Sequence, residues 1–269
     1  MGRPGDKRLQ PVTVMYIIQN VDESKAITCV GEEDEVKIGG ERFLEFTARC
    51  CKEGILPENC YCVRLYRTTY AGERLVNTTQ VNYVDPLDRK QILEADQELR
   101  HQMNIITDFL RKYVPGYEHC TIKTGASTLG IRESRRFSGK YVMNISDLRE
   151  ARRFPDVVVH KAQFVVDIHN PVGGGQANGI AEYVDAYDIP WRSLVPQKMD
   201  NLVLAGRCIS GTHEAMASYR VMAIAMAIGE AAGIGAALAI DHNVTPENLD
   251  VKYIQKALMD KGAVLFDEK

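Results

Sequence analysis

The feature that most constrains the fold is an almost entirely apolar run at residues 221–240, VMAIAMAIGEAAGIGAALAI. About 20 apolar residues are enough for a helix to cross a lipid bilayer. Most of these residues are alanine or glycine, however, and Glu230 near the centre would cost roughly 2.5 to 3.5 kcal/mol in a membrane. We therefore expect a buried helix of a globular protein, in which Gly229 and Gly233 let another backbone approach closely.

The residues before this run have the pattern of a strand, a glycine turn and a helix. Residues 201–205 (NLVLA) are continuously apolar, which predicts a buried parallel strand. Gly206 and Arg207 follow as the turn, and we expect the helix to begin near Arg220. Folds of the α/β class make anion or cofactor sites in this way, because a helix N-terminus presents unpaired N–H groups and partial positive charge. An ordinary connection between a strand and a helix has the same pattern.

Hydrophobic periodicity predicts strands and helices elsewhere, and therefore a mixed α/β chain. Runs rich in β-branched and aromatic residues predict strands at 11–19, 62–67 and 164–168, the last of them buried. Helical spacing of apolar residues predicts an amphipathic helix over 88–113, and Thr245 followed by Pro246 is the expected start of a last helix. Two segments stay open: 43–52 fits a strand or a short helix, and 128–143 fits a polar strand pair or a strand and loop.

Charge and cysteine content exclude several classes of protein. With 33 Lys and Arg against 36 Asp and Glu, the net charge is −3, so there is no basic field to bind nucleic acid or anionic lipid. The seven cysteines form an odd set, which indicates reduced thiols rather than a disulfide framework. Residues 1–12 lack the apolar stretch of a secretory signal, and we expect a cytoplasmic chain.

Other clusters of reactive residues are weak signals. Cys50-Cys51 and Cys60-x-Cys62 bring thiols together in sequence, but structural zinc sites usually pair Cys-x-x-Cys knuckles, so no metal site is expected. Ser210, His213 and Glu214 are the residue types of a hydrolase triad. They lie within five residues of each other, however, and so short a segment rarely allows the in-line geometry of a triad, so no hydrolase site is expected.

A longer stretch, residues 188–239 (DIPWRSLVPQKMDNLVLAGRCISGTHEAMASYRVMAIAMAIGEAAGIGAALA), resembles the C-terminal signature of a large family of FAD-dependent oxidoreductases. Further blocks similar to that family are residues 2–16, 88–102, 115–120, 129–143 and 165–171. The resemblance implies an α/β fold with a β-rich substrate domain that contains helices, joined to the C-terminal part of a Rossmann-type FAD-binding domain. It also implies FAD as the cofactor.

Members of that family open with a dinucleotide-binding unit that carries Gly-x-Gly-x-x-Gly. The sequence lacks this pattern, and the nearest string, Gly173-Gly174-Gly175 with Gly179, has the wrong spacing. The resemblance therefore implies a member that begins after the first nucleotide-binding segment. The expected division is a flavin-domain remnant or linker at 1–11, a substrate domain at 12–130, an interdomain and substrate-loop segment at 131–200, and a C-terminal flavin-domain segment at 201–269.

The cofactor-binding residues that the resemblance implies lie in two short segments. They are Gly206, Arg207 and Ser210 in the turn beside the ribityl chain and the loop after it, and Arg220, Val221 and Met222 at the helix start that faces the pyrimidine edge of the flavin. That edge gains negative charge on reduction, and a helix N-terminus stabilises such charge by up to roughly 1–2 kcal/mol.

Three residues are candidates for catalysis. Arg132 and Arg135 lie in an Arg-rich segment that resembles the family's junction of flavin and substrate domains, and an arginine fork binds a carboxylate or flavin oxygens with two hydrogen bonds. A salt-bridge set in which Glu133 ties two domains together fits the same segment. His169 precedes a glycine-rich loop and could supply a proton during hydride transfer, with a purely structural histidine as the alternative.

The function implied is that of an FAD-dependent oxidoreductase that transfers hydride between a small organic substrate and flavin. The alternative is a catalytically inactive fragment or subunit that needs a separate N-terminal nucleotide-binding segment. An incomplete flavin domain would expose apolar faces, which predicts a homo-oligomer. Neither a nucleic acid nor a membrane is expected as a partner.

Overall fold

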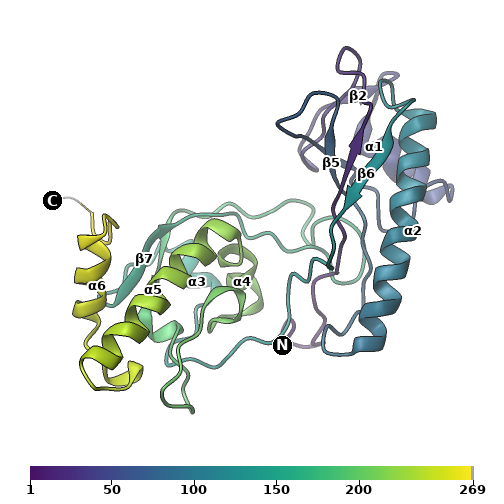
Figure 1. Cartoon of the computed structure of the whole chain (residues 1–269). Helices are drawn as coiled ribbons and strands as arrows, with labels where there is room; N and C mark the ends of the chain where they lie inside the picture. The colour runs from purple at the N-terminus through teal and green to yellow at the C-terminus, as the bar shows by residue number, and fades with distance from the viewer. Residues whose placement is uncertain (268–269) are drawn as a thin grey trace. The chain divides into compact units, whose positions relative to one another are not determined.

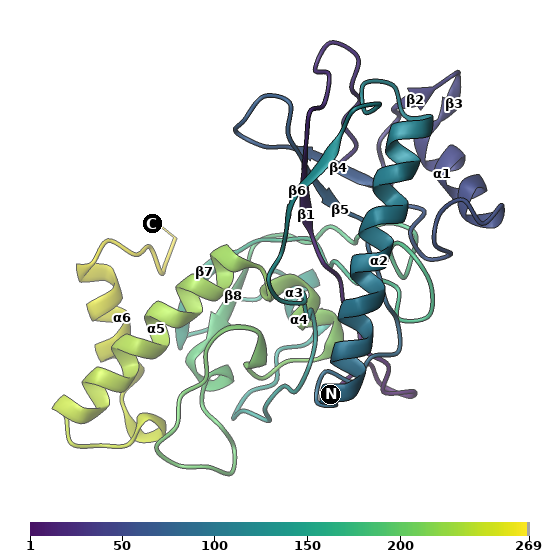
Figure 2. The same cartoon turned by 45° about the vertical axis from the view of Figure 1, so that its right-hand side comes forward.

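The computed structural model describes residues 1–267 as two compact units, which Figure 1 and Figure 2 show from two directions. Unit 1 comprises Met1–Lys7, Glu133–Ile168 and the chain from Ala181 onward, and unit 2 comprises Arg8–Arg132 and His169–Ile180. Each unit has its own hydrophobic core. Strands and helices occur in both units, which confirms the predicted mixed α/β fold class.

Unit 2 is built on a four-stranded antiparallel sheet with the order β4-β5-β1-β6. Its strands are β1 (Tyr16–Gln19), β4 (Arg64–Arg67), β5 (Arg74–Asn77) and β6 (Thr121–Gly125). Tyr16 of β1 pairs with Val76 of β5, and both side chains are buried. β1 and β4 lie inside the predicted strands at 11–19 and 62–67, whereas β6 lies outside every predicted strand. A separate pair, β2 (Lys37–Ile38) and β3 (Glu41–Arg42), leads into the first helix.

Two helices complete unit 2. Helix α2 (Arg89–Tyr113) confirms the predicted helix over 88–113 and lies beside the sheet in both views (Figure 1, Figure 2). The Asp88 side chain caps its start, and Leu99 and Ile106 on its inner face are fully buried with the strands. Helix α1 (Phe43–Lys52) settles the open segment 43–52 as helical, because Phe43, Thr47 and Cys50 recur at helical spacing and are buried together.

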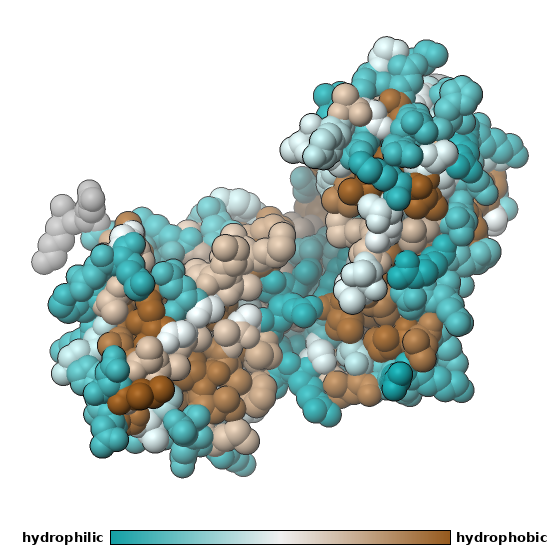
Figure 3. Space-filling view, viewed as in Figure 1, coloured by the Kyte–Doolittle hydropathy of each residue, from teal (hydrophilic) through white to brown (hydrophobic). Residues whose placement is uncertain are grey.

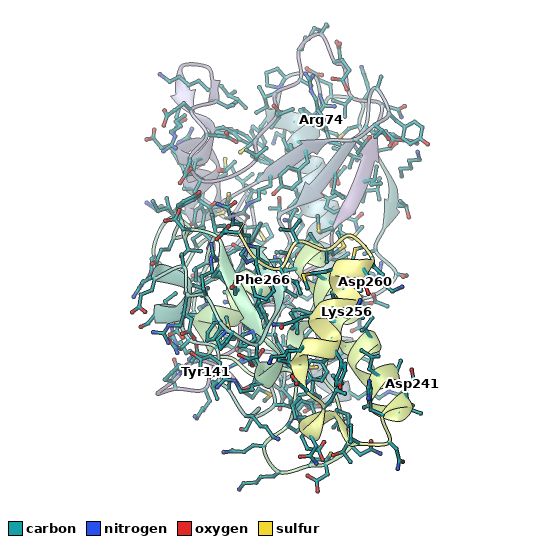
Figure 4. All side chains as sticks on the ribbon, turned by 90° about the vertical axis from the view of Figure 1, so that its left-hand side faces the viewer. Arg74, Tyr141, Asp241, Lys256, Asp260 and Phe266 are labelled. Carbon is teal, nitrogen blue, oxygen red and sulfur yellow. The ribbon has the colours of Figure 1, made fainter. Side chains whose placement is uncertain are left out.

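The buried guanidinium of Arg74 in the sheet is neutralised by one carboxylate (Figure 4). Arg74 donates to both oxygens of Glu23, at 2.6 and 2.8 Å, and the N–H of Gly72 also donates to Glu23, at 2.9 Å. The hydrogen bonds from Arg74 and Gly72 lower the pKa of Glu23 from 4.5 to about 2. The folded chain therefore holds this carboxylate ionised at pH values where the unfolded chain would protonate it.

Glu23 should make stability depend on acid pH. Because its folded pKa is lowered, its contribution is complete above about pH 4.5 and is lost as the pH falls through about 2. We expect the urea unfolding midpoint of Glu23→Gln to depend less on pH between these two values than that of the native protein. Glu45→Gln, on an exposed site of α1, is the matched control. An unchanged pH profile in Glu23→Gln would show that the pair contributes nothing to stability.

The glycine-rich segment at 169–180 folds onto unit 2. The side chain of Asn82 donates to the carbonyl oxygen of Asn170 at 2.9 Å. A Cβ at Gly174 would lie 2.8 Å from the ring of Tyr61, and one at Gly175 would overlap the Tyr61 hydroxyl. Close packing against Tyr61 therefore accounts for these glycines.

Unit 1 packs helices against a two-stranded antiparallel sheet. β7 (Val157–Ala162) pairs with β8 (Tyr187–Pro190), and α5 (Met222–Asp241) and α6 (Val251–Asp260) both contact β7 and each other. The shorter helices are α3 (Ile145–Arg149) and α4 (His213–Tyr219), with 3-10 turns η1 (Trp191–Ser193), η2 (Gly206–Cys208) and η3 (Pro246–Asn248). On the outer face of α6, Lys256 and Asp260 form an ion pair at 2.6 Å (Figure 4).

The predicted parallel strand at 201–205 is wrong for the described chain. These residues are extended, and the N–H of Leu204 donates to the carbonyl oxygen of Leu194 at 2.8 Å, but no strand pairs with them among residues 1–267. Of the five, only Leu204 is buried. A strand needs a partner that accepts its whole ladder of hydrogen bonds, and an apolar pattern alone does not supply one.

Other boundaries also differ from the predictions. Residues 164–168 contain only an isolated bridge from Val166 to Glu182, and the strand of this region is β7. Residues 128–143 contain isolated bridges but no named strand. Thr245 and Pro246 begin only the turn η3, while α6 starts later, at a cap made by the side chain of Asp250. In each case long-range pairing or a stronger local cap decides the element.

Helix α5 confirms the predicted Ala/Gly helix, but only one of its faces is buried. It ends at Asp241, and Asn243 then takes a left-handed conformation with φ of 52°. By length and composition α5 is long and apolar enough to cross a membrane, and 33% of its most apolar 18-residue stretch is buried. A single helix of this kind does not identify a membrane protein, because core helices pass the same test.

The outer face of α5 is exposed and, apart from Glu230, apolar. Figure 3 shows hydrophobic residues gathered along it, and its exposed positions recur three or four apart: Met222, Met226, Glu230, Gly233, Ala237 and Ile240, of which only Glu230 is charged. Apart from the adjacent residues and backbone of α5 itself, no atom of the described residues lies within 4 Å of a Cβ built at Gly229 or Gly233, so the predicted close approach there is wrong for residues 1–267. The close approach is instead at Gly235, where the ring of Trp191 packs against the helix.

Candidate functional site

The glycine turn singled out by the sequence lies against the Ala/Gly helix in unit 1. Gly206 begins η2 with φ of +76°, a left-handed conformation that favours glycine. The turn η2 contacts α5, which places Gly206 and the exposed Arg207 beside the helix. The thiol of Cys208 donates to the carbonyl oxygen of Ala205 at 3.3 Å. The turn is thus positioned by packing on α5 rather than by a strand before it.

The start of α5 has no side-chain cap. Helix α4 ends at Tyr219, and Val221 is extended, with φ of −70° and ψ of 153°, which separates the two helices. Val221 is the N-cap residue and offers no hydrogen bond from its side chain, so the first N–H groups of α5 are left for solvent or a ligand. Met222 at the first position is 83% exposed. Such a helix start favours negative charge.

Arg220, between the two helices, is anchored by a carboxylate. Its Nη2 donates to Oδ2 of Asp167 at 2.7 Å and to the carbonyl oxygen of Asp167 at 3.1 Å. Burial lowers the pKa of Arg220, and Asp167 opposes that effect. The Nε atom of Arg220 is buried and has no hydrogen-bond partner among the described residues. One donor of this guanidinium therefore remains unsatisfied by residues 1–267.

Ser210 is fixed by its backbone and leaves its hydroxyl unused. Its N–H donates to the carbonyl oxygen of Ser193 at 2.9 Å, and its carbonyl oxygen accepts from the N–H of Met143 at 3.1 Å. The hydroxyl oxygen is buried without a partner in the described part of the chain. Ser210 and Arg220, ten positions apart and on either side of α4, thus both present unsatisfied polar atoms.

A second polar group lies in the same unit around the first residue of α4. Nδ1 of His213 is 2.9 Å from Oε2 of Glu133, and Arg136 forms an ion pair with Oε1 of Glu133. All three side chains are buried, with exposed fractions of 3%, 0% and 9% for His213, Glu133 and Arg136. Arg136 is tied further by donating to the carbonyl oxygen of Gly211 at 2.9 Å. Glu133 therefore pairs within unit 1.

The three predicted catalytic residues are distributed over both units. Arg132 belongs to unit 2 and donates to the carbonyl oxygen of Pro11 at 2.9 Å, whereas Arg135 belongs to unit 1 and is exposed. His169 is buried in unit 2, where its backbone N–H donates to the side-chain oxygen of Gln10 at 3.1 Å. The six predicted cofactor-binding residues all lie in unit 1. The catalytic roles of these residues remain predictions.

An uncapped helix start, a glycine turn packed beside it and an arginine with a spare buried donor are features expected of a unit that binds a nucleotide cofactor. The sequence matches the family described as FAD dependent oxidoreductase over residues 1–258. The chain belongs to this family, and FAD is the cofactor of its members. No curated protein and no solved structure gave a significant match.

The residues of unit 1 fit FAD. Flavin carbonyl oxygens and phosphate oxygens accept hydrogen bonds, while ribityl hydroxyls both donate and accept. The unsatisfied Nε–H of Arg220, the unsatisfied hydroxyl of Ser210 and the uncapped N–H groups of α5 are complementary to these atoms. No group of three or more His, Cys, Asp or Glu side chains that could hold a metal occurs among residues 1–267.

Sequence reasoning missed two carboxylates of this region, Glu133 as the partner of His213 and Asp167 as the partner of Arg220. It considered His213 only together with Ser210 and Glu214, whereas the structure pairs it with a residue 80 positions away. Asp167 carried a usable signal, since it lies in the block 165–171 that resembles the family. The only sequence signal for Glu133 was that it is an acidic residue in an Arg-rich segment.

Proposed function

We propose that this flavin oxidoreductase transfers hydride between a small organic substrate and the isoalloxazine ring of FAD. The observation that carries the proposal is the set of unsatisfied donors around the start of α5, which suits a reduced, negatively charged ring edge. When bound, FAD supplies the two-electron redox chemistry. The protein supplies binding and electrostatics: Gly206 and Ser210 on the turn, and Arg220 with the first N–H groups of α5.

A spectroscopic experiment tests this function. The purified chain is titrated with FAD, and binding is followed by the visible flavin spectrum. The loaded protein is then mixed without oxygen with a panel of primary alcohols, primary amines and hydroxy acids, and bleaching of the visible band reports flavin reduction. We expect a yellow protein that at least one compound bleaches. A yellow protein that no compound of these classes bleaches would contradict hydride transfer from them.

A second candidate is a chain that is inactive until a separate nucleotide-binding segment completes it. The exposed apolar face of α5 favours it, because contiguous apolar surface of this kind usually marks an interface. This candidate predicts a colourless protein that takes up no FAD and that self-associates. Light scattering at micromolar concentration distinguishes the two: a monomeric yellow protein would contradict the second candidate.

Arg220→Gln should weaken FAD binding. The substitution removes the guanidinium donor and leaves the Asp167 carboxylate without its cation. A hydrogen bond to a charged group contributes about 1.5–3 kcal/mol, so we expect the dissociation constant for FAD to rise about tenfold or more in a fluorescence titration. Arg149→Gln, which removes an exposed arginine of the same unit, is the control. Equal affinity of Arg220→Gln and the native protein for FAD would show that Arg220 does not contribute to FAD binding.

A further inference from the structure

The contact between Glu133 and His213 places a carboxylate against an imidazole in the interior of unit 1. The Nδ1 atom of His213 lies within 3.0 Å of both carboxylate oxygens. A carboxylate only accepts hydrogen bonds, so Nδ1 carries the proton that lies between the two groups. In the neutral ring the lone pair is then at Nε2, on the opposite side of the imidazole from Glu133.

The buried carboxylate of Glu133 has a cation beside it as well as the imidazole. Arg136 balances the negative charge of Glu133, and donations to the carbonyl oxygens of Gly211 and Gly2, at 2.9 and 3.1 Å, hold the guanidinium in place. Buried ions are stable only when they are paired, and this pair is complete without a charged imidazole.

Two other ionisable groups, both at the end of α4, interact electrostatically with Glu133. Burial raises the pKa of Tyr219, which keeps its hydroxyl protonated as a donor to Ile209, and Arg220 is paired with Asp167. Neither provides a second acid or base at Nε2.

The side of the imidazole opposite Glu133 has no partner among the described residues. Nε2 of His213 is buried and has no hydrogen-bond partner among the described residues, as is also true of the Ser210 hydroxyl three positions earlier. Leaving a buried polar atom unsatisfied costs about 1–3 kcal/mol, so such atoms in native proteins usually meet a ligand or water. A lone pair at Nε2 selects a hydrogen-bond donor.

We propose that His213 is the proton-accepting catalytic residue, which contacts a hydroxyl or amino group of the substrate through Nε2, and that Glu133 is its positioning residue. The proposal rests on the proposed function. When an alcohol or amine is oxidised, its carbon loses a hydride to FAD and its O–H or N–H bond breaks. The electron pair of that bond forms the C=O or C=N double bond, and the proton binds the lone pair of Nε2. Glu133 then stabilises the imidazolium.

A second buried imidazole of unit 1, that of His160, also has an Nε2 without a hydrogen-bond partner among the described residues, but a carboxylate lies near that nitrogen. Nδ1 of His160 is 2.8 Å from Asp188, but its Nε2 is 3.5 Å from the carboxylate of Asp267. His160 therefore has a carboxylate beside each ring nitrogen, whereas only Nδ1 of His213 has one. It is therefore the matched control for substitutions of His213.

Nitrogen NMR of the full chain tests the tautomer directly. The chain contains six histidines, and with 15N-labelled histidine the resonances missing from His213→Asn are those of His213. We expect a protonated Nδ1 and an unprotonated Nε2 at pH 7, and loss of this fixed tautomer in Glu133→Gln but not in Glu214→Gln. A proton on Nε2 in the native protein would overturn the proposal.

The loaded protein provides the second readout. With a compound that bleaches the native flavin, we expect His213→Asn to slow reduction by about 10²–10⁴-fold without changing the visible spectrum of bound FAD, and added imidazole to restore part of the rate. Glu133→Gln should shift the pH profile of reduction, and His160→Asn should leave the rate unchanged. Native rates in His213→Asn would overturn the proposal. If no compound bleaches the native protein, the proposed function fails, while the NMR result still decides the protonation of His213.

Discussion

Gly235→Ala should destabilise unit 1 strongly. A Cβ at this position would overlap the ring of Trp191 and lie 3.1 Å from Cδ1 of Ile254. Both neighbours are buried, so neither can move without disturbing the contact of α5 with α6 and the sheet. Overpacking of this kind costs about 1–3 kcal/mol of unfolding free energy. Because Trp191 is the single tryptophan of the chain, its fluorescence during urea unfolding reports the change at the site itself.

Gly233→Ala is the control on the same helix. Apart from the adjacent residues and backbone of α5 itself, no atom of the described chain lies within 4 Å of a Cβ at Gly233, and alanine favours a helix over glycine by roughly 0.5–1 kcal/mol. We expect unchanged or slightly raised stability. Equal destabilisation by both substitutions would mean that the contact with Trp191 is not what selects glycine at position 235.

Arg64→Met should destabilise unit 2 by a similar or larger amount. Arg64 donates to both carboxylate oxygens of Glu32, at 2.7 and 2.8 Å, and the two side chains are only 10% and 11% exposed. Removing one partner of a buried ion pair leaves an uncompensated charge and costs about 3–5 kcal/mol. Circular dichroism during urea unfolding measures the loss.

The double variant Glu32→Leu with Arg64→Met separates charge from packing. Replacing both partners of a buried pair by apolar residues is often neutral, so the double variant should recover most of the stability that Arg64→Met loses. A double variant no more stable than Arg64→Met would show that the arginine acts through packing of its aliphatic stem instead.

The sequence predicts well those helices and strands whose determining residues lie within the element itself. Helix α2 differs from its prediction by one residue at its start, because a capping aspartate, apolar residues at helical spacing and Pro115-Gly116 all act within the segment itself. Residues 43–52 carry weaker periodicity, and only the burial of Phe43 and Cys50 in the core of unit 2 distinguishes helix from strand.

Elements that depend on distant partners are predicted poorly. Residues 201–205 have the composition of a buried strand, yet none of the described residues supplies the neighbouring strand that would define one. For the same reason the apolar run of α5 predicts the helix but not which of its glycines is packed. Gly229, Gly233 and Gly235 are alike in sequence, and only the position of Trp191 distinguishes them.

The sequence by itself determined the mixed α/β class, the long Ala/Gly helix and the family, because periodicity and motif are properties of adjacent residues. The tertiary structure alone decided which side chains act together. Glu133 with His213 and Asp167 with Arg220 are pairs from distant segments, and each is stable only because folding removes water from both partners at once. Burial also left Nε2 of His213 and Nε of Arg220 without partners, and no pattern of residue types encodes that.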